Sequence, residues 1–119
     1  MDIMSAVSAT ALASKVVGIY DRLGLTQEEI GGIVDASARS VSRWVTGQVV
    51  PQRLNKARLL ELAYVADAVA EVLPASQANV WMFSPSRLLD HDTPAERIHK
   101  GQYRDVLDLI EAIADGAFV

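Results

Sequence analysis

Apolar residues recur at helical spacing along most of the chain, and no segment alternates apolar and polar residues as a half-buried strand does. The first predicted helix spans residues 5–23, and Gly24 ends it. Four apolar residues share one face of this helix: Leu12, Val16, Ile19 and Leu23. The pattern predicts an all-α protein without internal repeats.

Two short helices joined by a tight turn are predicted next. The stretch from residue 25 to residue 47 reads LTQEEIGGIVDASARSVSRWVTG. Thr26 and Glu29 form a capping box that starts the first helix, Ser37 can cap the second, and Gly47 can end it. This arrangement is a helix-turn-helix, whose second helix usually enters the DNA major groove. It resembles the Xre/Cro-type repressor motif.

Three residues of this stretch have a predicted structural role. Asp35 occupies a turn position where Xre-type motifs usually have glycine, and Asp tolerates the left-handed conformation better than most residues. Gly31 holds the small-residue position at which the two helices meet closely. Trp44 lies on the inner face and is predicted to be core.

A longer helix is predicted from Arg53 to about residue 72, before Pro74. Apolar residues cover so much of its circumference that it needs burial on more than one side. We expect it to bridge two subdomains or two subunits of a dimer. The predicted organisation is a helix-turn-helix DNA-binding domain, residues 1–73, with its bridging helix at 53–73, followed by a small helical domain, residues 74–119.

The second half is predicted to contain four short helical segments: residues 77–83, 87–89, 93–100 and 103–115. Thr93 and Glu96 form a second capping box, with Pro94 at the first helical position. Gly116 ends the last helix and is followed by an apolar tail. From the residues alone, packing of this tail against its own domain and insertion into a partner are equally favoured.

Two further groups in the second half receive structural interpretations. The densest aromatic cluster is predicted to be the core of the second domain: Trp81, Met82, Phe83, Pro85 and Leu88. The acidic pairs Asp90/Asp92 and Asp105/Asp108 are predicted to be solvated surface. Neither group predicts catalysis.

The charge of the 119-residue chain is unevenly distributed. The net charge is −4, but five basic side chains and no acidic one lie between residues 36 and 60: Arg39, Arg43, Arg53, Lys56 and Arg58. Residues 1–35 carry two basic and five acidic side chains, and residues 61–119 carry four and ten. Because salt screens charges beyond about 8–10 Å, a phosphate backbone responds to this local field.

The positive segment coincides with the helix-turn-helix, so we interpret the second helix as a DNA-reading helix. Its predicted contacts are Ser37, Ala38, Arg39, Ser40, Ser42 and Arg43. Arginine can bind guanine through two hydrogen bonds, and serine can reach phosphates or base edges. The resemblance to Xre-type domains implies phosphate contacts by Arg53 and Lys56, although from the residues alone these could equally be surface charge. The alternative is a solvated helix whose arginines are ordinary surface charge.

Several functional classes are disfavoured. The chain has no cysteine, and its two histidines, His91 and His99, lack the spacing of a metal site. No phosphate loop, nucleophile motif or catalytic carboxylate pair is present. We expect a non-enzyme without catalytic residues, metal or cofactor. With no signal peptide and no membrane-spanning run, we expect a cytoplasmic protein.

The second half resembles the toxin-binding domain of Xre/MbcA/ParS-type antitoxins. The matching residues are Val80 to Leu89 (VWMFSPSRLL), Thr93-Pro94, Gly101, Val106 and Leu109. With the helix-turn-helix before it, about 95 of the 119 residues resemble an antitoxin of this family, in particular of the mycobacterial MbcA type.

The resemblance implies a partner, a RES-domain toxin that degrades NAD, whose active site the antitoxin's C-terminal segment occludes. It implies a toxin-binding surface made of Trp81, Arg87, Asp115, Gly116, Ala117, Phe118 and Val119. The acidic second half suits a basic partner surface. The resemblance also implies that the helix-turn-helix represses the antitoxin's own operon and that the antitoxin is a homodimer.

Two alternatives remain at this point. The chain can be a stand-alone dimeric helix-turn-helix regulator whose C-terminal subdomain binds a small ligand or only dimerises. It can also be an interaction adaptor whose helix-turn-helix does not contact DNA. Co-expression with a toxin separates the first interpretation from both alternatives.

Overall fold

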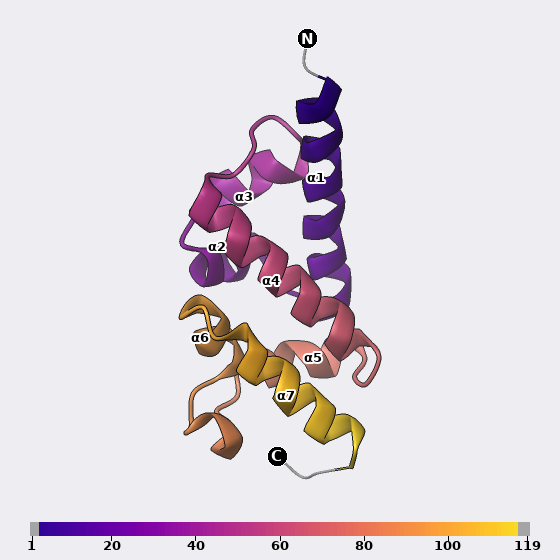
Figure 1. Cartoon of the computed structure of the whole chain (residues 1–119), viewed down its shortest axis with the longest axis vertical. Coiled ribbons are helices and arrows are strands. Elements are labelled where there is room, and N and C mark those ends of the chain that lie inside the picture. The colour runs from indigo at the N-terminus through magenta and orange to yellow at the C-terminus, as the bar shows by residue number, and fades with distance from the viewer. Residues whose placement is uncertain (1–2, 117–119) are drawn as a thin grey trace.

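The structure, a computed structural model, describes residues 3–116 and consists there of helices without strands, which confirms the predicted all-α fold. The molecule is elongated, 51 × 23 × 21 Å (Figure 1). Its elements, in chain order, are α1 Ile3–Leu23, α2 Gln27–Val34, α3 Ala38–Val45, α4 Arg53–Ala70, α5 Ala75–Met82, a 3₁₀ turn η1 Arg87–Leu89, α6 Pro94–His99 and α7 Tyr103–Ala114.

Helix α1 runs along one side of the upper half of the molecule and packs against α3, α4 and α5 (Figure 1). The four residues predicted to share its inner face are all buried, at 4% exposure or less. Gly24 ends the helix with a left-handed φ of 62°, as predicted. Its carbonyl oxygen accepts a hydrogen bond of 3.0 Å from the side-chain amide of Asn79, which connects α1 to α5.

The start of α2 is the predicted capping box. The Glu29 amide donates to the Thr26 hydroxyl at 3.1 Å, and the Thr26 amide donates to Glu29 Oε1 at 2.9 Å. Asp35 ends the helix in the left-handed conformation, with φ of 59°. A Cβ at Gly31 would collide with the carbonyl oxygen of Ala36, so the predicted need for a small residue is confirmed.

Helix α3 also begins and ends as predicted. The Ser37 hydroxyl accepts from the Ser40 amide at 3.1 Å. At the other end, the Gln48 amide donates to the Arg43 carbonyl at 3.0 Å around Gly47, whose φ is 74°. This is a Schellman ending, in which glycine occupies the left-handed position. Trp44 is buried, which confirms its assignment to the core.

Helix α4 ends at Ala70, about two residues before the predicted end. Residues 71–73 form a turn instead, in which the Leu73 amide donates to the Val69 carbonyl at 2.8 Å. Pro74 explains the difference, because proline disfavours helical geometry in the residue before it. Three large hydrophobic residues, Leu54, Leu60 and Tyr64, remain exposed on α4.

Helix α4 contacts α1 and α2 as well as α5, α6 and α7, so it lies between the two halves of the molecule (Figure 1). Tyr64 and Tyr103 join α4 to α7 through an edge-to-face contact with 6.5 Å between ring centroids. The buried residues form one continuous core that crosses the predicted boundary at 73/74. The two halves are therefore physically coupled through shared packing.

The second half follows the predicted helical segments, including the capping box of Thr93 and Glu96. The predicted aromatic core is only partly correct. Met82 is fully buried, but Phe83 is 39% and Leu88 is 61% exposed. Helix α5 is short and ends at Met82, so the residues after it lie on a turn whose side chains reach the surface.

Candidate nucleic-acid and partner-binding surfaces

The exposed side of α3 presents two unengaged arginines. Arg39 and Arg43 lie four residues apart and are both exposed, so they share one face of the helix. In the described part of the chain, no carboxylate lies within 4 Å of either guanidinium. Both side chains are therefore free to bind an anionic surface.

The serines and the alanine of the same helix are less available for contacts with DNA than predicted. Ser37 caps α3 and also donates to the Ser40 hydroxyl at 3.0 Å, so these two side chains satisfy each other. Ala38 and Ser42 are half-buried. Of the predicted reading residues, Ser37 and the two arginines are exposed, and only the arginines have no hydrogen-bond or ion-pair partner among the described side chains.

The basic residues near the start of α4 divide into two groups. Arg53 is exposed and Lys56 half-exposed, and neither is paired with an acid in the described residues. Arg58 is different: its Nη1 lies 2.8 Å from Glu61 Oε1, and its Nε donates to the His99 carbonyl at 3.3 Å. It is therefore turned toward the second half and contributes little to the positive field of the first.

Arg58 also packs against the turn after α6. A Cβ built at Gly101, which has a φ of 84°, would lie 2.7 Å from Arg58 Nη2. Glycine is thus favoured at this position by the left-handed backbone, and a Cβ would also force the guanidinium of Arg58 to shift. One arginine of the predicted DNA-binding segment in this way anchors the C-terminal half.

The carbonyl groups at the end of α2 are a second point of attachment. His99 Nδ1 on α6 lies 3.2 Å from the Ile33 carbonyl oxygen. The Asn55 side chain on α4 donates to the carbonyls of Val34 and Asp35, at 2.6 and 3.1 Å. The last carbonyls of a helix have no partner within it, and these side chains supply one. The junction lies at the turn of the helix-turn-helix.

Arg97 on α6 organises the loop after η1. Its side chain is only 14% exposed and lies 2.8 Å from Asp92, 2.7 Å from Asp105 and 3.7 Å from Asp90. It also donates to the Leu89 carbonyl at 2.7 Å. The prediction that these acids are solvated surface is therefore wrong for Asp92, whereas Asp105 is exposed as predicted but is also paired with Arg97.

The carboxylate of Asp92 is further held by Lys100, at 2.7 Å. The hydrogen bond from Lys100 and then that from Arg97 lower the pKa of Asp92 below its ordinary value. The same contacts with Asp92 raise the pKa of Arg97. The loop 87–92 is thus held in place by charge-assisted hydrogen bonds that require an ionised Asp92.

The predicted toxin-binding residues lie at several places on the second half. Trp81 is half-buried and packs against the core, whereas Arg87 is exposed on η1. Asp115 and Gly116 are exposed just beyond the end of α7, and Gly116 has a φ of 87°. The predicted plug residues Ala117, Phe118 and Val119 lie outside the described residues.

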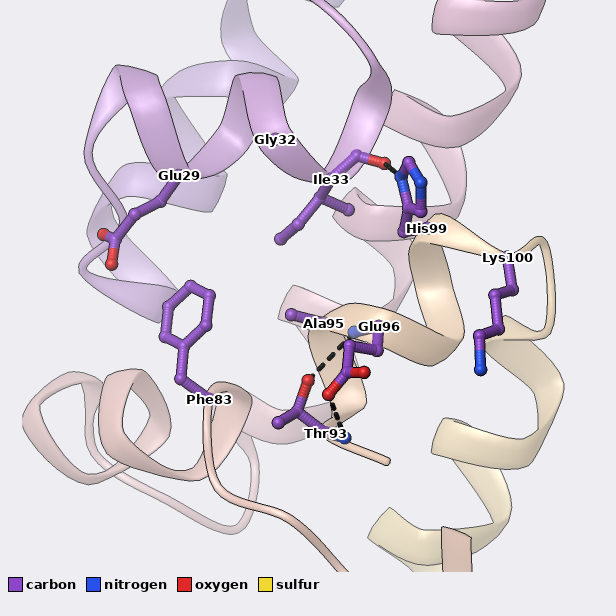
Figure 2. A pocket seen from close by; sticks show the side chains of 9 residues that line it. All are labelled: Glu29, Gly32, Ile33, Phe83, Thr93, Ala95, Glu96, His99 and Lys100. Carbon is purple, nitrogen blue, oxygen red and sulfur yellow. Dashed lines mark hydrogen bonds between the residues drawn. The ribbon is translucent and has the colours of Figure 1, made fainter. Parts of the chain in front are cut away.

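A groove of about 520 Å³ separates α2 from α6 beside the junction (Figure 2). Its apolar lining includes Ile33, Phe83 and Ala95, and the ring of Phe83 points toward α2. Glu29 and Glu96 line it as well. The groove thus combines elements of both halves of the chain.

Within residues 3–116, no cluster of three or more His, Asp or Glu side chains is arranged to hold a metal ion. No helix in that range has the length and apolarity needed to cross a membrane.

Two features could not be predicted from the sequence: the contacts of His99 and Asn55 with the end of α2, and the groove between α2 and α6. His99, Asn55 and Arg97 act through contacts between residues far apart in the chain, and no local spacing reveals such contacts. The groove had one available signal. Of the adjacent glycines at 31 and 32, only Gly31 is explained by the predicted helix packing.

The chain is similar to known proteins along nearly its whole length, although no family model matches it. The mycobacterial cidal antitoxin MbcA of Mycobacterium tuberculosis is 66% identical over 113 residues, which cover 95% of this chain and all of that protein, and the same holds for MbcA of Mycobacterium bovis. A probable mycobacterial cidal antitoxin of M. tuberculosis is 31% identical over 107 residues, which cover 90% of this chain and 91% of that protein.

A solved structure shows that the fold is shared as well as the sequence. A chain in the crystal structure of the M. tuberculosis MbcT–MbcA toxin–antitoxin complex superposes with a TM-score of 0.82 at 68% identity, covering 91% of this chain and 97% of that one. The helix-turn-helix followed by a short helical half is thus shared along nearly the whole length. The chain belongs to the family of the mycobacterial cidal antitoxin MbcA.

Proposed function

We propose that this protein is the antitoxin of a toxin–antitoxin pair and that it binds and neutralises a RES-domain toxin that degrades NAD. The observation that carries the proposal is the 66% identity to MbcA, which extends over both halves of the chain. The solved relative belongs to a complex of toxin and antitoxin, which supports a toxin as the partner. The protein acts by binding, in the cytoplasm, without catalysis or a cofactor.

Neutralisation occurs at the C-terminal end. Helix α7 ends at Ala114, and Asp115 and Gly116 are exposed just beyond it. In the sequence, the acidic Asp115 is followed by the apolar tail Ala117-Phe118-Val119. A cleft that binds the phosphates of NAD is expected to be basic, so this tail is suited to occlude it.

The helix-turn-helix represses the antitoxin's own operon. The unpaired Arg39 and Arg43 read bases in the major groove, while Arg53 and Lys56 contact phosphates. Two copies form a homodimer that reads half-sites about one helical turn apart. Repression and neutralisation are divided between residues 1–73 and 74–119, with α4 shared by both halves.

The partner is tested by co-expressing the adjacent toxin gene with this chain and purifying on a tag carried by the antitoxin. We expect the toxin to co-purify and its growth inhibition to be relieved. A gel shift on the upstream DNA at two salt concentrations tests the second activity, because phosphate contacts make binding weaken as salt rises. A chain that binds DNA but leaves the toxin active would instead support a stand-alone regulator.

A further inference from the structure

The groove between α2 and α6 has the properties of a binding site. Its volume, about 520 Å³, lies within the range of about 300–1,000 Å³ that is usual for ligand pockets. Phe83 is 39% exposed on its wall, opposite Ile33 (Figure 2). A large aromatic side chain left half in water beside an apolar wall gains from being covered.

Gly32 leaves the wall formed by α2 open to close approach by another molecule. A Cβ at Gly32 would meet no atom within 4 Å, in contrast to Gly31, whose Cβ would strike the Ala36 carbonyl. Glycine inside a helix costs about 0.5–1 kcal/mol relative to alanine. Intramolecular packing in the described residues does not require this glycine, whereas close approach of a binding partner does.

The groove has an acidic rim. Glu29 and Glu96 each use Oε1 in their capping boxes, at 2.9 and 3.1 Å. Among the described residues, no donor reaches the second carboxylate oxygen of either glutamate, so each retains acceptor capacity. The neighbouring Lys100 is held by Asp92 at 2.7 Å and does not neutralise the rim. A binding partner that is complementary to this groove would insert an apolar side chain and carry basic residues next to it, facing the two glutamates.

We propose that this groove receives an apolar side chain carried on a basic segment of the partner toxin, as a second contact besides the C-terminal plug. The proposal rests on the proposed antitoxin function. The acidic rim repels DNA. A second copy of this chain is disfavoured because its basic side chains are concentrated between residues 36 and 60, the segment proposed to face DNA, whereas residues 61–119 carry four basic and ten acidic side chains.

The groove lies beside α6, which precedes α7 in the chain, whereas Asp115 and Gly116 follow the other end of α7. This helix has 12 residues, or a length of about 18 Å, with α6 at its start and the predicted plug beyond its end. The toxin is thus held at two separated points. The groove contributes affinity, whereas the plug blocks chemistry, so the two effects can be measured independently.

The test is made on the full-length chain. Gly32→Leu places an apolar side chain in the groove, and because a Cβ at this position meets no atom within 4 Å, the helix backbone does not have to move to accept it. The double variant Glu29→Gln and Glu96→Gln removes the rim charge but keeps both capping boxes, since glutamine also serves at that position. Glu28→Gln, an exposed residue on the same first turn that does not line the groove, is the matched control.

Affinity for the purified toxin is measured by titration calorimetry, with circular dichroism to verify the fold. We expect Gly32→Leu to weaken binding about tenfold or more. The double glutamine variant should weaken binding and reduce its salt dependence, while Glu28→Gln leaves both unchanged. At saturating antitoxin, every variant should still block NAD consumption, because the plug is intact.

Unchanged toxin affinity in a folded Gly32→Leu protein overturns the groove contact and leaves the antitoxin function standing. If Gly32→Leu instead lowers the oligomeric state in sedimentation while toxin affinity stays the same, the occupant is a second copy and the proposal is wrong. If the unmodified chain does not bind the toxin, the antitoxin function itself fails, and the groove contact with it.

Discussion

The imidazole of His99, on α6, lies 3.2 Å from the carbonyl oxygen of Ile33, in the last turn of α2. This contact connects the C-terminal half directly to the helix-turn-helix. Nδ1 of the same ring is also 3.7 Å from Asp35, the left-handed residue that forms the turn before α3. The orientation of α3 is therefore coupled to the position of α6.

His99→Ala should lower the free energy of unfolding by about 0.5–1.5 kcal/mol, because it leaves the Ile33 carbonyl without its partner. Urea unfolding followed by circular dichroism measures the change. His91→Asn is the control: His91 is exposed with a φ of 71°, and asparagine tolerates that conformation. Equal stability of the two variants would show that the His99 contact contributes nothing.

The adjacent glycines should respond in opposite directions to the same substitution. Gly31→Ala should destabilise the fold by about 1–3 kcal/mol, since its methyl group meets the Ala36 carbonyl. Gly32→Ala should stabilise it by about 0.5–1 kcal/mol, because alanine costs less in a helix and the space is open. Thermal unfolding of both variants checks the signs, and destabilisation by Gly32→Ala would contradict the open space.

The ion-pair cluster around Arg97 should make stability sensitive to acid. The contacts with Lys100 and Arg97 lower the pKa of Asp92 in the folded protein below its unfolded value. Their contribution is therefore fully present above the unfolded pKa and is lost as the pH falls through the folded pKa. Asp92→Asn should be less stable than the unmodified chain at neutral pH, and the difference should disappear in strong acid.

Asp108→Asn is the matched control for this acid effect. Asp108 is exposed on α7, and no Lys, Arg or His lies within 4 Å of its carboxylate among the described residues. Its replacement should leave the pH profile of unfolding nearly unchanged. A difference between Asp92→Asn and the unmodified chain that persists at low pH would mean that packing, and not the ionised carboxylate, carries the effect.

Operator binding should depend on the two free arginines of α3. Replacing Arg39 or Arg43 by alanine should cost about 1–3 kcal/mol each and relax base preference if each reads a base. Replacing Lys56 should weaken binding to all sequences alike and lower the salt slope by about one. Arg87→Ala, an exposed change in the other half, should leave DNA affinity unchanged in a gel shift.

Local patterns in the sequence predicted the helices well because their start and stop signals act over a few residues. Both capping boxes, the left-handed Asp35 and the glycine endings are contacts between near neighbours in the chain. The same reasoning placed Trp44 in the core. The end of α4 was misplaced because the effect of Pro74 on the preceding residues outweighed the apolar pattern.

The surroundings of the candidate site residues could not be predicted, because they depend on contacts between residues far apart in the sequence. Arg58 belongs by sequence to the basic segment, yet its contacts with Glu61 and the His99 carbonyl turn it toward the C-terminal half. Asp92 and Asp105 read as surface acids until Arg97 is placed between them. Such pairings require the packing of α4, α6 and α7, which only the folded chain provides.

The most direct measurement of the central claim is the rate at which the partner toxin consumes NAD in the presence of the full-length chain or of a chain lacking residues 115–119. Helix α7 ends at Ala114, so this deletion leaves every described helix intact. The account predicts full inhibition by the intact chain and none by the truncated one, although the truncated chain still binds the toxin. Equal inhibition by both would contradict occlusion by the C-terminal segment.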